Sequence, residues 1–174
     1  GVAELMLTSV HALKRTGADF VICPDNTIHQ AMKYVEPTTP LPWIHIAEAV
    51  ASVAQQKHYR KIGILGTKWL VMSDVYPQKM ANKGIEAMRP NEQDITSVSN
   101  IIMDELVLNE VSERSQTHLI NVVKRLKEQG CDAVVAGCTE IPLLLNDENS
   151  PLPVLDSPRI LAEAATCHAL GSKS

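Results

Sequence analysis

Short apolar runs alternate with longer amphipathic stretches along the whole chain. The runs are rich in Val, Ile, Leu and Ala, which is typical of strands buried on both faces of a parallel sheet. They lie at residues 19–23, 61–65, 85–88, 132–136 and 153–155. Between them, apolar residues recur three or four positions apart and predict helices. These helices are expected at residues 3–15, 28–34, 47–57, 69–83, 92–108, 113–129, 140–145 and 158–170.

The alternation of strands with helices indicates βαβ units, and therefore an α/β fold with parallel sheets flanked by helices. The segments around Cys23 and Cys138 share a layout of helix, glycine, strand and small polar loop. This weak internal repeat is compatible with two pseudo-symmetric lobes. For such a division, we expect the first lobe to comprise residues 1–45 and 151–174 and the second to comprise residues 46–150.

Composition and charge exclude several classes of protein. With 174 residues, 45% of them hydrophobic, the chain is neither disordered nor collagen-like and can form a sizeable core. The net charge of −4, the lack of a dense Lys/Arg cluster and an aromatic content of 3% argue against a nucleic-acid partner. No apolar run approaches the ~20 residues of a membrane span, and the first residues do not read as a signal peptide. The four cysteines lack C-x-x-C or metal-ligand spacing, so we expect reduced thiols, a cytoplasmic location and no metal site.

Two small polar loops follow predicted strands and carry the residues suited to chemistry. They lie at residues 23–29 and 137–142. Ligands of open parallel sheets bind at the carboxyl ends of the strands, which is where both loops are expected. Cys138 precedes a short helix, and a helix N-terminus is expected to lower the pKa of its thiol. The alternative is a buried structural thiol, and the position of Cys138 leaves both interpretations open.

The segments Asp25-Asn26-Thr27-Ile28-His29 and Gly137-Cys138-Thr139-Glu140-Ile141-Pro142 resemble the two signature loops of the aspartate/glutamate racemase superfamily. Further similarity lies at residues 17–20, 64–67, 76 and 156–162. The resemblance implies two similar α/β lobes with the active site between them. It also implies racemisation of amino acids without pyridoxal phosphate or any other cofactor.

The chemistry implied by the resemblance uses two acid/base groups. One removes the α-proton from one face of a bound amino acid, and the other returns a proton to the opposite face. A group whose pKa lies near the operating pH can serve both steps. The resemblance makes Cys138 one of these groups and places Asp25 in the opposite position. The substrate-binding residues that it implies are Asn26, Thr27, Thr139, Glu140 and Thr67.

The chain departs from the family pattern at three places. Asp25 stands where members commonly have a cysteine, and it could act as a base, pair with the substrate amine or cap the following helix. Cys23 could replace the missing thiol, although a buried strand end is the favoured interpretation. Val107 stands where some members have a lysine for an acidic substrate, which favours a less acidic one. The family's first strand should precede residues 3–15, so the first lobe is expected to lack its N-terminal strand.

The sequence therefore supports three hypotheses about function. The leading one is an isomerase of amino-acid metabolism, a pyridoxal-independent racemase or epimerase of a small amino acid. The first alternative is a single-cysteine decarboxylase or isomerase of a small carboxylic acid. The second is a catalytically silent homologue that binds a carboxylate. We also expect a homodimer without a membrane partner.

Overall fold

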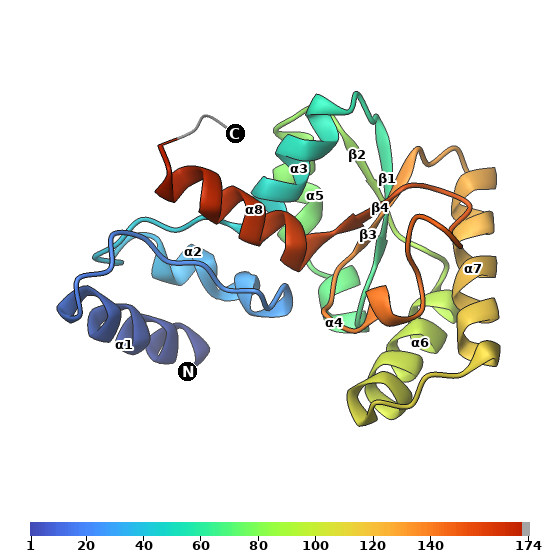
Figure 1. Cartoon of the computed structure of the whole chain (residues 1–174), viewed down its shortest axis with the longest axis horizontal. Coiled ribbons are helices and arrows are strands. Elements are labelled where there is room, and N and C mark those ends of the chain that lie inside the picture. The colour runs from blue at the N-terminus through green and yellow to red at the C-terminus, as the bar shows by residue number, and fades with distance from the viewer. Residues whose placement is uncertain (172–174) are drawn as a thin grey trace.

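A computed structural model describes residues 1–171 and contains a four-stranded parallel sheet (Figure 1). The strands are β1 (Lys61–Leu65), β2 (Glu86–Met88), β3 (Ala133–Ala136) and β4 (Val154–Asp156). Their order is β2-β1-β3-β4, and every neighbouring pair is parallel. Helices flank the sheet, so the predicted α/β fold is confirmed.

The helical elements alternate with the strands along the chain, as βαβ units require. The α-helices are α1 (Val2–Arg15), α2 (Met32–Val35), α3 (Ile46–Gln56), α4 (Lys68–Val71), α5 (Val75–Ala81), α6 (Glu92–Asn100), α7 (Glu113–Glu128) and α8 (Ser157–Ala169). The tighter or wider turns are η1 (Thr27–Ala31), η2 (Ile101–Glu105), η3 (Leu106–Leu108) and η4 (Ile141–Leu143). Within the part of the chain that the structure describes, no helix combines the length and apolar character needed to cross a membrane.

Alternate strand residues face two separate hydrophobic layers, because successive side chains of a strand point to opposite faces. On one face, Ile62 and Ile64 pack with residues of α3, α5 and α8. On the other face, Leu65 and Val134 pack with residues of α6 and α7. With both faces covered, the carboxyl edge of the sheet is where a ligand can reach the strand ends.

The N-terminal region forms a small helical layer beside the sheet. α1 packs on α2 through Met6, Met32 and Val35, and Figure 1 shows both helices to one side of the sheet. The prediction of a strand at residues 19–23 is wrong, since only Val21 forms a bridge, with Trp43.

The reason for the single bridge lies in the facing segment. The N–H of Val21 donates to the carbonyl of Pro42 at 2.9 Å, and the N–H of Ile44 donates to the carbonyl of Val21 at 3.0 Å. Pro40 and Pro42 lack an N–H, so this segment cannot continue a ladder towards its N-terminus. Residues 1–45 therefore contain no strand ladder.

The lobe boundaries remain a prediction. β4 and α8 belong to the range 151–174 that the sequence assigned to the first lobe. In the structure, β4 pairs with β3 of the sheet, and α8 packs on α3. Residues 172–174 of that range lie outside the described residues.

Two predicted helices differ from the structure in ways that shape the site. The stretch 69–83 is divided into α4 and α5, and Pro77 does not break α5 because it lies in its first turn. The stretch 92–108 begins as α6, widens into the π-helical turn η2 and ends in the 3-10 turn η3. A π-turn within a helix often accompanies a functional site, and η2 contributes to the cavity described below.

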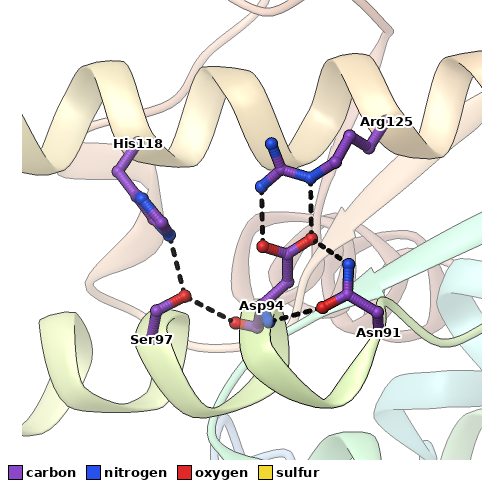
Figure 2. A network of polar contacts seen from close by, with 5 residues as sticks. All are labelled: Asn91, Asp94, Ser97, His118 and Arg125. Atoms are coloured by element: carbon purple, nitrogen blue, oxygen red, sulfur yellow. Dashed lines mark hydrogen bonds and ion pairs between the residues drawn. The ribbon is translucent and has the colours of Figure 1, made fainter.

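A network of polar contacts fixes α6 to α7 (Figure 2). The buried carboxylate of Asp94 accepts two hydrogen bonds from Arg125, at 2.8 and 2.6 Å. Asn91 caps α6 by accepting from the Asp94 N–H at 2.8 Å. The Ser97 hydroxyl donates to the Asp94 carbonyl, so His118 Nε2 must donate to Ser97 Oγ at 2.7 Å. Because η2 continues directly from α6, this network also holds η2 in place.

Candidate active site

A cavity of about 290 Å³ opens at the carboxyl edge of the sheet, between the two polar loops and η2. Its walls contain all the candidate residues chosen from the sequence, which come from three separate parts of the chain. These residues are Asp25, Asn26, Thr27, Thr67, Cys138, Thr139 and Glu140. The structure therefore brings the two loops, residues 23–29 and 137–142, together around one space.

Asp25 begins the first loop and has an exposed side chain at this cavity. Its Oδ1 accepts from the N–H of Ile28 at 3.0 Å, which is the Asx-type cap considered from the sequence. Its backbone carbonyl is bound by Nδ1 of His29 at 2.8 Å. The cap thus fixes one carboxylate oxygen of a residue that still lines the cavity.

Asn26 is held by a buried chain of hydrogen bonds that joins four elements. The Tyr76 hydroxyl on α5 donates to Asn26 Oδ1 at 2.6 Å, and Asn26 Nδ2 donates to Ser157 Oγ at 2.9 Å. The Ser157 hydroxyl in turn donates to the Ala136 carbonyl at the end of β3, at 2.7 Å. Burial raises the pKa of Tyr76 above its ordinary value, so its hydroxyl remains a donor. A supporting role for Ser157 was not predicted from the sequence, although its place in Asp156-Ser157-Pro158 is a helix-start signal.

Replacing Tyr76 with phenylalanine is expected to lower the free energy of unfolding by about 1–3 kcal/mol, because Asn26 Oδ1 would lose its donor in a buried position. Urea denaturation measures the change. The matched control is Tyr34→Phe, because Tyr34 is exposed and its loss of a hydroxyl should leave stability unchanged. Equal effects of the two substitutions would contradict the role of the hydrogen bond.

Cys138 follows β3 in the second loop and is half-buried at the cavity wall. Burial raises the pKa of its thiol to about 12, although the N–H groups of Ile141 and Glu140 act in the opposite direction. The prediction of a lowered pKa is therefore wrong. The following helix, η4, spans only Ile141–Leu143, and its N–H groups do not compensate for the loss of solvent. The carboxylate of Glu140 also contributes to the raised pKa.

Thr67 offers a hydroxyl that has no protein partner. Its Oγ1 is the single buried side-chain polar atom without a hydrogen bond in residues 1–171. Leaving a buried polar group unpaired is costly, so this atom is suited to a bound ligand. Thr139, by contrast, already donates to Glu140 Oε1 at 2.5 Å. A ligand that uses the Thr139 hydroxyl would have to compete with this contact.

The described residues of the cavity wall carry negative charge and no positive charge. Asp25 and Glu140 are its acidic residues, and the lining residues that the structure describes include no lysine or arginine. Ile102, Met103 and Val107 form an apolar side contributed by η2 and η3. Among residues 1–171, no group of three or more His, Cys, Asp and Glu residues is close enough to hold a metal ion.

Cys23 does not line this cavity, although it lies two residues before Asp25. Burial raises the pKa of its thiol, and it is half-buried. His168 is also absent from the cavity wall and contacts Phe20 instead, with ring centroids 4.8 Å apart. Cys138 is consequently the one cysteine of this chain at the cavity.

Gly137 allows the second loop to pass close to the end of β1. Its N–H donates to the Leu65 carbonyl at 2.8 Å, and an added Cβ would lie 2.6 Å from that oxygen. Gly137→Ala is therefore expected to lower the free energy of unfolding by about 1–3 kcal/mol. Gly66→Ala is the matched control, because its Cβ would meet a side-chain methyl of Leu70 at 2.9 Å and no backbone atom closer than 3.5 Å. Urea denaturation should show the smaller loss for Gly66→Ala, and the reverse order would contradict this explanation.

Together, the parallel sheet and the two loops at its carboxyl edge define an α/β protein with candidate acid/base groups around a small cavity that has polar and apolar sides. The chain belongs to the Asp/Glu/hydantoin racemase family, whose profile matches residues 1–165. The resemblance inferred from the two loops is thereby confirmed.

Solved structures and characterised relatives agree with this assignment. A candidate Asp/Glu racemase from Yersinia pestis is 37% identical with a TM-score of 0.90, over 97% of this chain and 74% of that one. An aspartate racemase homologue from Pyrococcus horikoshii OT3 is 28% identical with a TM-score of 0.83, over 94% of this chain and 74% of that one. The broad specificity amino-acid racemase RacX of Bacillus subtilis (strain 168) is 24% identical over 165 residues, which are 93% of this chain and 70% of RacX. The match to the glutamate racemase of Limosilactobacillus reuteri (strain DSM 20016) spans only 48% of that relative.

Proposed function

We propose that the protein is a pyridoxal-independent amino-acid racemase or epimerase in which Asp25 and Cys138 act on opposite faces of the substrate. The observation that supports this most strongly is the single cavity lined by both loops, with one acid/base candidate from each. Membership of the racemase family supports the reaction class.

The reaction begins with the substrate carboxylate bound by the loops and by the Thr67 hydroxyl. The Asp25 carboxylate takes the α-proton, and the electron pair of the broken C–H bond moves into the substrate carboxylate. Cys138, whose raised pKa keeps its thiol protonated, donates its S–H proton to the other face of the α-carbon, and the electron pair returns from the carboxylate to form the new C–H bond. The reverse direction needs the thiolate, which a substrate ammonium group close to Cys138 would favour. Hydrogen-bond donors at the carboxylate stabilise the charge that develops in either direction.

The substrate is proposed to be a small amino acid whose side chain is not acidic. Val107 and its neighbours give the cavity an apolar side, and no lysine or arginine among the described lining residues would neutralise a second carboxylate. The name of RacX indicates broad specificity for that relative and agrees with this proposal.

A second candidate function is a decarboxylase or isomerase of a small carboxylic acid that uses one thiol. It is favoured by the observation that Cys138 is the one cysteine at the cavity. The third candidate function is that of a homologue that binds a carboxylate without turnover. We also propose that the protein is a homodimer and that it is located in the cytoplasm. The location is supported by the spacing of the four cysteines, which matches neither a disulfide framework nor a metal site.

Incubation of the protein with L- and D-amino acids in deuterium oxide tests the proposal. We expect proton NMR to show loss of the α-proton signal for both enantiomers of at least one small neutral amino acid. Carbon dioxide released from a malonate-type acid would instead support the decarboxylase. Thermal stabilisation by a ligand without turnover would support the silent homologue, and a panel without any exchange would overturn the racemase proposal.

A further inference from the structure

We propose that His29 is a positioning residue for the racemase reaction: its neutral imidazole holds the Asp25 peptide and so sets the direction of the Asp25 carboxylate. This inference rests on the proposed role of Asp25. His29 lies in η1, directly behind the first loop, and is 3% exposed. It does not line the cavity and therefore acts through Asp25.

The two hydrogen bonds of His29 permit only one protonation state. Nδ1 lies 2.8 Å from the Asp25 carbonyl, which has no proton, so Nδ1 must carry the hydrogen. Nε2 accepts from the N–H of Ile46 at 3.4 Å, so Nε2 must be unprotonated. A doubly protonated ring would direct an N–H at the N–H of Ile46 and lose this contact. The neutral ring protonated on Nδ1 is therefore the form that connects the first loop to the start of α3.

A second buried histidine supports this arrangement. The His45 ring lies edge-on to His29, with centroids 4.5 Å apart. His45 Nδ1 accepts from the N–H of Ala47 at 3.2 Å and caps α3. Burial lowers the pKa of both rings, so both rings favour the neutral form. The two neutral rings thus lie between the first loop and the start of α3.

The charged groups around His29 and His45 come from several elements. Asp25 is the acidic group on the loop itself. Lys79 on α5 faces both rings and is paired with Glu48 on α3 at 3.1 Å. Lys33, Glu36 and Asp74 line a neighbouring cavity of about 420 Å³ together with His29. Lys79 opposes a proton on His29 whereas Asp25 favours one, and burial is the largest influence against it.

Two contacts connect His29 to the geometry of the carboxylate. His29 holds the Asp25 carbonyl, while the Ile28 N–H holds Asp25 Oδ1 at 3.0 Å. Loss of the first contact frees the Asp25 peptide to rotate, and the carboxylate then loses its cap. A displacement of about 1 Å in a reacting group can lower a rate by about 10²-fold.

The variants His29→Phe and His29→Asn separate positioning from packing. Phenylalanine fills the space but cannot donate, so we expect kcat for α-proton exchange to fall by about 10²-fold with little change in KM. Asparagine places an N–H donor where Nδ1 stood and should restore most of the rate. Since asparagine does not titrate, His29→Asn should also lose rate less steeply than the wild-type protein at acidic pH, once the pH falls below the lowered pKa of His29. His11→Asn is the control, because His11 is exposed on α1 and should leave rate and pH profile unchanged.

NMR tests the same inference without relying on activity. The ring nitrogen shifts of His29 should identify the neutral form protonated on Nδ1. Hydrogen exchange at the Ile28 amide should be slow in the wild-type protein and His29→Asn, and fast in His29→Phe. Protonation on Nε2, or unchanged Ile28 protection in His29→Phe, would overturn the inference whether or not the protein racemises an amino acid. A wild-type protein with this tautomer and protection but without exchange would instead contradict the proposed function alone.

Discussion

Cys138→Ala is expected to lower the rate of α-proton exchange by about 10²–10⁴-fold, the range that a positioned general acid or base contributes. In the proposed reaction, the thiol at the cavity returns a proton on the face opposite Asp25, and alanine offers no proton. Substrate affinity should change little, because the loops and Thr67 hold the substrate carboxylate in this proposal. Proton NMR in deuterium oxide measures the rate, and titration calorimetry measures the affinity.

Cys167→Ala is the matched control for the loss of a thiol. Cys167 is also half-buried, but it lies on α8 away from the cavity, so its removal should leave exchange unchanged. The variant Asp25→Cys adds a second comparison, because a gain in exchange would show that the opposite position accepts the more common family residue. Exchange at the wild-type rate in Cys138→Ala would show that this thiol does not transfer the proton.

The sequence predicted the part of the site that depends on short local patterns. Cys138 and Thr139 follow an apolar run and precede a short helix, and the structure places them at the end of β3. Asn26 and Thr27 lie against them in the same cavity. The carboxyl end of β3 accounts for the position of Cys138 and Thr139. The first loop follows no strand of the sheet, and hydrogen bonds from Asn26 to Tyr76 and Ser157 hold it there instead.

The parts that were missed depend on contacts between distant elements. The pKa of Cys138 follows from its burial against the rest of the fold, which a helix-start pattern does not report. The strand expected at residues 19–23 has the right composition, but its partner segment contains prolines and pairs only at Val21. The link from Tyr76 through Asn26 to Ser157 spans 131 positions between its last two members. No local pattern contains such a link, since its residues lie in three separate segments of the chain.

Between pH 7.5 and pH 4, His45→Asn is expected to lose about 3 kcal/mol less unfolding free energy than the wild-type protein. Burial lowers the pKa of His45 from 6.5 to about 3, so the folded protein keeps the ring neutral. The unfolded chain binds a proton below about pH 6.5, and unfolding therefore takes up a proton between the two pKa values. Stability is retained above pH 6.5 and falls by about 1.4 kcal/mol per pH unit as the pH decreases towards 3. Asparagine removes this titration but still offers an oxygen to cap α3.

Urea denaturation of wild type and variant at pH 7.5, 6, 5 and 4 measures this difference. Near pH 7.5 the two stabilities should be similar, because His45 is neutral in both folded and unfolded wild-type protein and the cap is conserved. The His11→Asn control removes an exposed histidine of α1 and should follow the wild-type curve at every pH. Parallel curves for wild type and His45→Asn would mean that the ring is not held neutral, because only a group that binds protons differently in the two states changes the slope.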